Sequence, residues 1–171
     1  GLEPQTRKLF EVCRLNGLPV FTFVNKLDRP SLEPLEILDQ IEQEFNLPTY
    51  AVNWPIGSGD QFRGVFHRPM REVHLFDKTG AAGRAKGAIA NVLKFDDPRL
   101  REILPEDVMS LLEEEVELLD ELGGELDLQA VRDGQLTPVF FGCVRSAASL
   151  LLPSRSFHLA PRRLFLLLPR G

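Results

Sequence analysis

The stretch VFTFVNKLD, residues 20–28, decides how the rest of this chain is interpreted. Its first five residues are β-branched or aromatic, a composition typical of a strand buried in a sheet. The next four residues, Asn25, Lys26, Leu27 and Asp28, follow the pattern N-K-x-D. In open α/β sheets, ligands bind in the crevice at the carboxyl ends of the strands, so the motif lies where a ligand is expected.

These residue types suit a guanine base. The Asp28 carboxylate can accept hydrogen bonds from two adjacent donors of guanine, N1–H and the 2-amino group, and adenine lacks this pair. Asn25 offers an amide that can bond the opposite edge of the base or brace a neighbouring loop. Lys26 can lay its aliphatic stem across the ring, and Leu27 is expected to turn into the core. The local pattern leaves one alternative open, a polar turn in which Asp28 or Ser31 starts the next helix.

Composition places the chain among soluble globular proteins. Of its 171 residues, 43% are hydrophobic and 26% are charged, which is ordinary for that class. The net charge of −5 argues against a nucleic-acid-binding surface over the whole chain, although a local basic patch stays open. Cys13 and Cys143 lie among apolar neighbours and are expected to be reduced core residues. Without an apolar run of membrane-spanning length or a signal peptide pattern, we expect a cytoplasmic protein with no membrane partner.

Charge changes abruptly near residue 144. Residues 144–171 contain five arginines and no Asp, Glu or Lys. Because the whole chain holds 20 basic and 25 acidic residues, residues 1–143 hold 15 and 25 of them. Low-complexity sequence rich in Arg, Leu, Pro and Ser is expected when GC-rich coding sequence is translated out of frame. We therefore predict that this tail is frameshifted, the alternative being a genuine basic tail that binds RNA or acidic lipid.

Hydrophobic periodicity predicts alternating helices and strands. Helices are expected over residues 4–16, 32–45, 97–122 and 128–133. Strands are expected over residues 20–24, 49–53, 62–67, 72–77, 89–95 and 137–142. The predicted buried residues are Leu9, Val12, Cys13 and Leu15 in the first helix, Leu35, Leu38, Ile41 and Phe45 in the second, and Val108, Leu111, Leu112, Val116, Leu119 and Leu122 in the long helix, whose stripe Glu115 interrupts.

Two further groups of residues are candidates for chemistry. Gly57 and Gly59 can cradle a phosphate, but the Lys-Ser/Thr ending of a phosphate loop is missing, so a turn or an insert boundary is favoured. His67 and His74 lie on two strands of a predicted hairpin without a cysteine or carboxylate pattern for zinc, so packed or solvent-facing histidines are favoured over a metal pair.

Three segments, in this order and spacing, resemble the guanine-nucleotide-binding domain of translational GTPases. They are FTFVNKLDRP at 21–30, WPIGSGDQFRGVFHR at 54–68 and LTPVFFG at 136–142. The first fifteen residues resemble the helix that follows that family's third strand. Within the family, Trp54, the GVFHR continuation and NKLD rather than NKMD favour the release-factor branch, and elongation factor G stays as the alternative. The resemblance covers residues 1 to about 143.

The resemblance implies an α/β fold, a partial P-loop-type GTPase domain with a mainly parallel sheet and an α+β insert. The implied divisions are residues 1–56 as the C-terminal half of the G domain with the guanine-specificity motif, 57–136 as the insert, 137–143 as the last G-domain strand, and 144–171 as the aberrant tail.

The resemblance also assigns roles to residues. It carries Asn25, Lys26 and Asp28 over as guanine contacts, with Leu27 inside the motif. It places the last guanine-contacting loop at Cys143 and the residue after it, where the family has Ser-Ala.

The implied ligand is GTP or GDP, and the implied partners are the ribosome and the class-one release factors, whose recycling after peptide release the whole factor stimulates. A GTPase also needs a phosphate-binding loop, a magnesium ligand and switch segments. Neither G-x-x-x-x-G-K-S/T nor D-x-x-G-H occurs in this sequence, so we expect these parts, including the Mg²⁺ site, before Gly1. Hydrolysis is therefore not expected of this chain by itself, and two other classes stay open, a non-enzymatic α/β binding module and a non-functional remnant.

Overall fold

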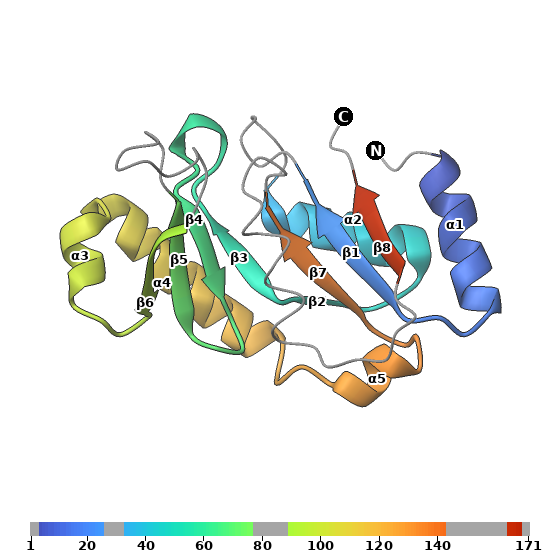
Figure 1. Ribbon diagram of the computed structural model, residues 1–171. Helices are drawn as coiled ribbons and strands as arrows, with labels where there is room; N and C mark the ends of the chain where they lie inside the picture. The colour runs from blue at the N-terminus through green and yellow to red at the C-terminus, as the bar shows by residue number, and fades with distance from the viewer. Residues whose placement is uncertain (1–3, 26–32, 77–88, 143–163, 169–171) are drawn as a thin grey trace.

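The structure is a computed structural model that describes residues 4–25, 33–76, 89–142 and 164–168. One four-stranded sheet is entirely parallel, in the order β2-β7-β1-β8. Its strands are β1 (Val20–Val24), β2 (Thr49–Ala51), β7 (Thr137–Phe141) and β8 (Leu164–Leu168). The predicted strand at 20–24 is thus confirmed, between β7 and β8 (Figure 1).

The second sheet is antiparallel, in the order β3-β4-β5-β6. Its strands are β3 (Asn53–Ile56), β4 (Gly64–His67), β5 (Glu72–Phe76) and β6 (Ile89–Lys94). The segment predicted as one strand over 49–53 therefore forms the short strand β2 and then starts β3 in the other sheet. The parallel and antiparallel sheets confirm the predicted α/β class, whereas the insert boundary at residue 57 stays a prediction.

The described helices are α1 (Pro4–Leu15), α2 (Pro34–Phe45), α3 (Arg99–Ile103), α4 (Glu106–Leu122) and α5 (Leu128–Arg132). Of these, α1, α2 and α5 cover the two faces of the parallel sheet. On one face, the ring of Phe10 in α1 packs at a tilt against that of Phe45 in α2, with centroids 4.1 Å apart. On the other, Val131 of α5 packs with Phe21 and Phe140. Figure 1 shows α3 and α4 alongside the second sheet and α1 beyond β8.

One hydrophobic cluster joins the two sheets. It contains Val24 and Phe141 of the parallel sheet, Trp54 and Val65 of the antiparallel sheet, and Leu112 of α4. The Trp54 and Phe141 rings pack edge to face, with centroids 5.6 Å apart. Because apolar burial of this kind is the main source of folding free energy, the two sheets stabilise each other.

The predicted buried faces of two helices are partly wrong. Leu9, Val12 and Leu15 of α1 are 47%, 55% and 80% exposed, and the buried residues are Thr6, Phe10 and Cys13. These three recur at i, i+4 and i+7, one helical stripe, and that stripe carries the Phe10 ring that contacts α2.

In α4 the buried stripe is likewise rotated from the prediction. Met109 takes part in it with Leu112, Val116 and Leu119, whereas Leu111 and Leu122 are exposed. In α2, Ile41 and Phe45 are buried as predicted, together with Ile37, while Leu35 and Leu38 are half-buried. Apolar residues lie on more than one face of α4, and the buried face is the one that packs in the cluster with the second sheet.

The segment around Gly57 is a turn, as favoured from the sequence. Gly57 has φ +74°, and a Cβ atom there would lie 2.4 Å from the carbonyl oxygen of Gln61. Only glycine tolerates both conditions. A short 3₁₀ helix, Gly59–Gln61, follows directly.

His67 and His74 are packed side chains, with ring centroids 6.2 Å apart. Both are buried in the second sheet, and Nδ1 of His67 accepts a hydrogen bond from the backbone N–H of Met70 at 3.3 Å. Burial, with the nearby His74 in second place, lowers the pKa of His67 from 6.5 to about 4. His67 is therefore neutral at pH 7.

We expect the folded protein to lose stability as the pH falls from 7 towards 4. The pKa of His67 is lower in the folded state than in the unfolded chain, so its contribution is complete above about pH 6.5 and is lost as the pH falls towards 4. The shift corresponds to about 3 kcal/mol of unfolding free energy. Urea denaturation of the wild type and of His67→Gln at pH 7, 6 and 5 measures it. The variant should show a shallower pH dependence, and parallel curves for the two proteins would refute the assignment.

Candidate functional site

The carboxyl ends of β1 and β7 meet at one edge of the parallel sheet. Val24 is the register partner of Phe141, and the backbone N–H of Gly142 donates to the carbonyl of Val24 at 3.0 Å. Asn25 follows Val24 directly and is half-buried. The start of the predicted guanine motif and the start of the predicted second loop are thus adjacent, at the end of the sheet where α/β proteins bind ligands.

The other predicted site residues lie outside the described residues. These are Lys26, Leu27 and Asp28 of the motif and Cys143 of the second loop. Their roles stay predictions, and the described part of the edge is made by Val24, Asn25, Phe141 and Gly142.

A buried amide fixes this edge. Asn53, the first residue of β3, donates from Nδ2 to the carbonyl of Phe141 at 3.0 Å, and its Oδ1 accepts the N–H of Phe141 at 2.7 Å. Its side chain is fully buried. A buried amide whose oxygen and nitrogen are both paired satisfies the usual requirement for polar groups in a core. Sequence analysis assigned no role to Asn53.

The opposite end of the same strands is also held by side chains. The Thr137 hydroxyl donates to the carbonyl of Val20 at 3.0 Å, and its oxygen lies 3.0 Å from the hydroxyl of Thr22. Both threonines are buried. Polar side chains therefore join β1 to β7 at their amino ends, whereas at the carboxyl end Asn53 bonds β7 alone and the Gly142–Val24 backbone bond joins the two strands.

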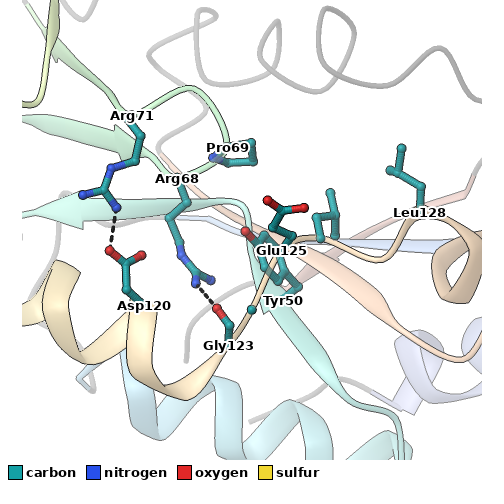
Figure 2. A pocket seen from close by; sticks show the side chains of 10 residues that line it. Tyr50, Arg68, Pro69, Arg71, Asp120, Gly123, Glu125 and Leu128 are labelled. Atoms are coloured by element: carbon teal, nitrogen blue, oxygen red, sulfur yellow. Dashed lines mark hydrogen bonds and ion pairs between the residues drawn. The ribbon is translucent and has the colours of Figure 1, made fainter.

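A separate cavity of about 610 Å³ lies where the parallel sheet meets the end of α4. Figure 2 shows Tyr50 and Glu125 on one side of it and Arg71, ion-paired with Asp120, on the other. Nη1 of Arg71 is 2.6 Å from the Asp120 carboxylate. Burial raises the pKa of Tyr50, so its hydroxyl stays protonated at neutral pH. Arg71 and Asp120 neutralise each other at the cavity wall, and no role in chemistry follows from the lining.

Arg68, which follows β4 directly, lines this cavity and links β4 to β2 and to the end of α4. Its guanidinium donates to the carbonyls of Ala51 at 3.2 Å, Leu119 at 2.7 Å and Gly123 at 2.9 Å. It also lies over the Tyr50 ring, 4.4 Å from its centroid. Two of the three carbonyls belong to the end of α4, where the helix dipole favours a cation. The Leu119 carbonyl also accepts the backbone N–H of Gly123. Arg68, part of the GVFHR segment, is thus a structural cap.

No metal centre is found in the described ranges. Within residues 4–25, 33–76 and 89–142, no three His, Cys, Asp or Glu side chains gather closely enough to hold an ion. In the same part of the chain, none of the helices has the length and apolar content that crossing a bilayer requires.

The parallel sheet with helices on both faces defines an α/β domain, and comparison with known families identifies which one. The family described as the elongation factor Tu GTP binding domain matches residues 1–151, so the chain belongs to this family of GTP-binding domains. Among individual proteins, it is similar to peptide chain release factor 3, with 59% identity to that of Rippkaea orientalis and 58% to those of Trichormus variabilis and Synechocystis. The release-factor resemblance expected from the sequence is thereby confirmed.

The matched region covers 142 residues, 83% of this chain and 26% of each of these relatives. The chain thus spans about a quarter of the length of the curated relatives it matches. A crystal structure from Thermus thermophilus has the same fold, with a TM-score of 0.56 and 20% identity, over 91% of this chain and 24% of that one.

Replacing Arg68 by lysine should destabilise the fold. Lysine keeps the charge but cannot reach all three carbonyls, and buried groups left unpaired cost about 1–3 kcal/mol each. We expect the free energy of unfolding to fall by about 2–4 kcal/mol, measured by urea denaturation at pH 7.

Arg14→Lys is the matched control. Arg14 makes an exposed ion pair with Glu11 three residues away, and such pairs contribute little. Equal midpoints for Arg68→Lys and the wild type would contradict the capping role.

Proposed function

We propose that this chain is the guanine-reading part of a GTP-binding translation termination factor. The observation that carries the proposal is the position of N-K-x-D, which begins at the carboxyl end of β1, next to the end of β7. That geometry supports a base held between the segments that follow the two strands. Membership in a family of GTP-binding domains supports a guanine nucleotide as the ligand.

In this proposal the Asp28 carboxylate accepts N1–H and the 2-amino group, which selects guanine over adenine. The stem of Lys26 covers the face of the ring, and the Asn25 amide bonds the opposite edge or braces the second loop. Leu27 anchors the motif in the core. A backbone N–H of the second loop, at Cys143 or the next residue, donates a hydrogen bond to the guanine carbonyl oxygen.

Phosphate chemistry is assigned to residues other than these. The sequence contains neither a phosphate-loop pattern nor a D-x-x-G-H segment. A GTPase needs these groups to hold the phosphates and Mg²⁺ and to place the attacking water. We therefore propose that this chain hydrolyses neither GTP nor GDP by itself.

The biological setting follows from the relatives. Proteins 56–59% identical to this chain are named peptide chain release factor 3. We propose that the whole factor acts in the cytoplasm on the ribosome and promotes recycling of class-one release factors. An elongation factor G-like role is the second candidate, and the names of these relatives favour the first.

We expect the chain to bind GDP weakly. Base contacts alone provide a few hydrogen bonds, each worth about 1–3 kcal/mol even when charge-assisted, which corresponds to a dissociation constant of about 1 mM or weaker. Titration calorimetry with GDP at 25 °C measures it. Submicromolar affinity would show that phosphate contacts exist in this chain and would contradict the assignment.

Base selectivity should depend on Asp28. Inosine diphosphate lacks the 2-amino group, so the wild type should bind GDP at least about tenfold more tightly, as expected for one charge-assisted hydrogen bond worth about 1.5–3 kcal/mol. Asp28→Ala should bind both nucleotides weakly and equally, as followed by NMR titration.

Asp39→Ala, which removes an exposed carboxylate on α2, is the control and should keep the preference. A GDP preference that survives in Asp28→Ala would assign base reading to another residue.

A further inference from the structure

Asn53 takes over backbone pairing at the point where the chain leaves the parallel sheet. The ladder between β2 and β7 ends at the pair Ala51–Val139, and the N–H of Val52 still donates to the carbonyl of Val139 at 2.9 Å. Beyond this point the chain turns into β3, and the Asn53 amide bonds both polar backbone groups of Phe141. The Asn53 side chain thus makes the two hydrogen bonds with Phe141 that the backbone of a further β2 residue would make.

Phe141 is the last residue of β7, so its position sets where the following segment begins. The next residue, Gly142, donates its N–H to the carbonyl of Val24, and Val24 directly precedes Asn25. The Phe141 ring is held as well, because it packs against Trp54, the neighbour of Asn53 in β3. Two consecutive residues of the second sheet therefore fix both the backbone and the ring of Phe141.

We propose that Asn53 is a positioning residue for guanine recognition, which fixes the end of β7 at Phe141, next to the Gly142–Val24 bond to β1, so that one base fits beside the carboxyl ends of both strands. This inference rests on the proposed guanine-binding function. Asn53 touches no nucleotide in this scheme. It acts by keeping the ligand edge in its binding-competent arrangement, because apparent affinity falls in proportion to the competent fraction.

Two substitutions of Asn53 distinguish a positioning role in nucleotide binding from a purely structural role. Asn53→Ala leaves the N–H and the carbonyl of Phe141 without their partner. Asn53→Asp keeps the acceptor for the N–H but loses the donor and places a carboxylate oxygen against the Phe141 carbonyl. A purely structural amide would lower the melting temperature in both variants without changing the affinity of the molecules that remain folded.

The matched control is Thr137→Val. Thr137 lies in the same strand, is equally buried and bonds another strand, but it does so at the amino end of the sheet, away from the ligand edge. Its loss should lower the melting temperature and leave nucleotide affinity unchanged.

The test is NMR titration of the full 171-residue chain with GDP and, separately, with inosine diphosphate, at a temperature where every variant is folded. In Asn53→Ala, affinity for both nucleotides should fall by the same factor, about three- to tenfold if the competent fraction drops to between a third and a tenth. The ratio between the two nucleotides should not change, because Asp28 still reads the 2-amino group. Amide hydrogen exchange at Phe141 and Gly142 should accelerate in the same variant.

Each outcome has one meaning. If the wild type shows no concentration-dependent shifts with GDP up to about 20 mM, well above a dissociation constant of about 1 mM, the proposed function fails. If the wild type binds and Asn53→Ala binds equally well despite a lower melting temperature, the positioning role alone is overturned. Equal affinity losses in Asn53→Ala and Thr137→Val would also overturn it, because the effect would then follow general destabilisation. Should Asn53→Ala not fold, Asn53→Asp carries the same comparison.

Discussion

The arrangement of the two sheets depends on one buried side-chain amide. At residue 52 the chain departs from a parallel sheet and enters an antiparallel one, and such a departure would leave the backbone of Phe141 buried and unpaired. Buried peptide groups without partners are costly. Asn53 supplies both missing hydrogen bonds, so β3 can diverge while β7 stays fully paired up to its last residue.

Arg68 links the same two sheets to α4. Its guanidinium bonds the carbonyls of Leu119 and Gly123 at the end of α4, where the Leu119 carbonyl also accepts the N–H of Gly123, and the carbonyl of Ala51 at the end of β2. Together with the hydrophobic cluster that includes Val24 and Leu112, these bonds make the second sheet part of the support for the carboxyl ends of β1 and β7.

Much of this fold could be predicted from local patterns, and the exceptions have a common cause. The apolar run at 20–24, the hairpin of β4 and β5 and the turn at Gly57 all depend on neighbours close in sequence. The Asn53–Phe141 pair spans 88 residues and the Arg68–Leu119 pair spans 51. A single buried Asn or Arg leaves no periodic signal, so neither role could be found from sequence. The buried faces of α1 and α4 were predicted wrongly because each helix contains more apolar residues than one stripe can bury.

The strand β8 affects whether β1 can pair with strands of other copies of this molecule. Residues 164–168 lie beyond the family match and within the segment that contains arginine and no acid, yet they pair with every residue of β1, from Val20 with Leu164 to Val24 with Leu168. Backbone pairing does not depend on side-chain identity, and an open strand edge is a template for intermolecular pairing. The pairing therefore shields that side of β1 from strands of other molecules, whatever reading frame encoded the segment that provides it.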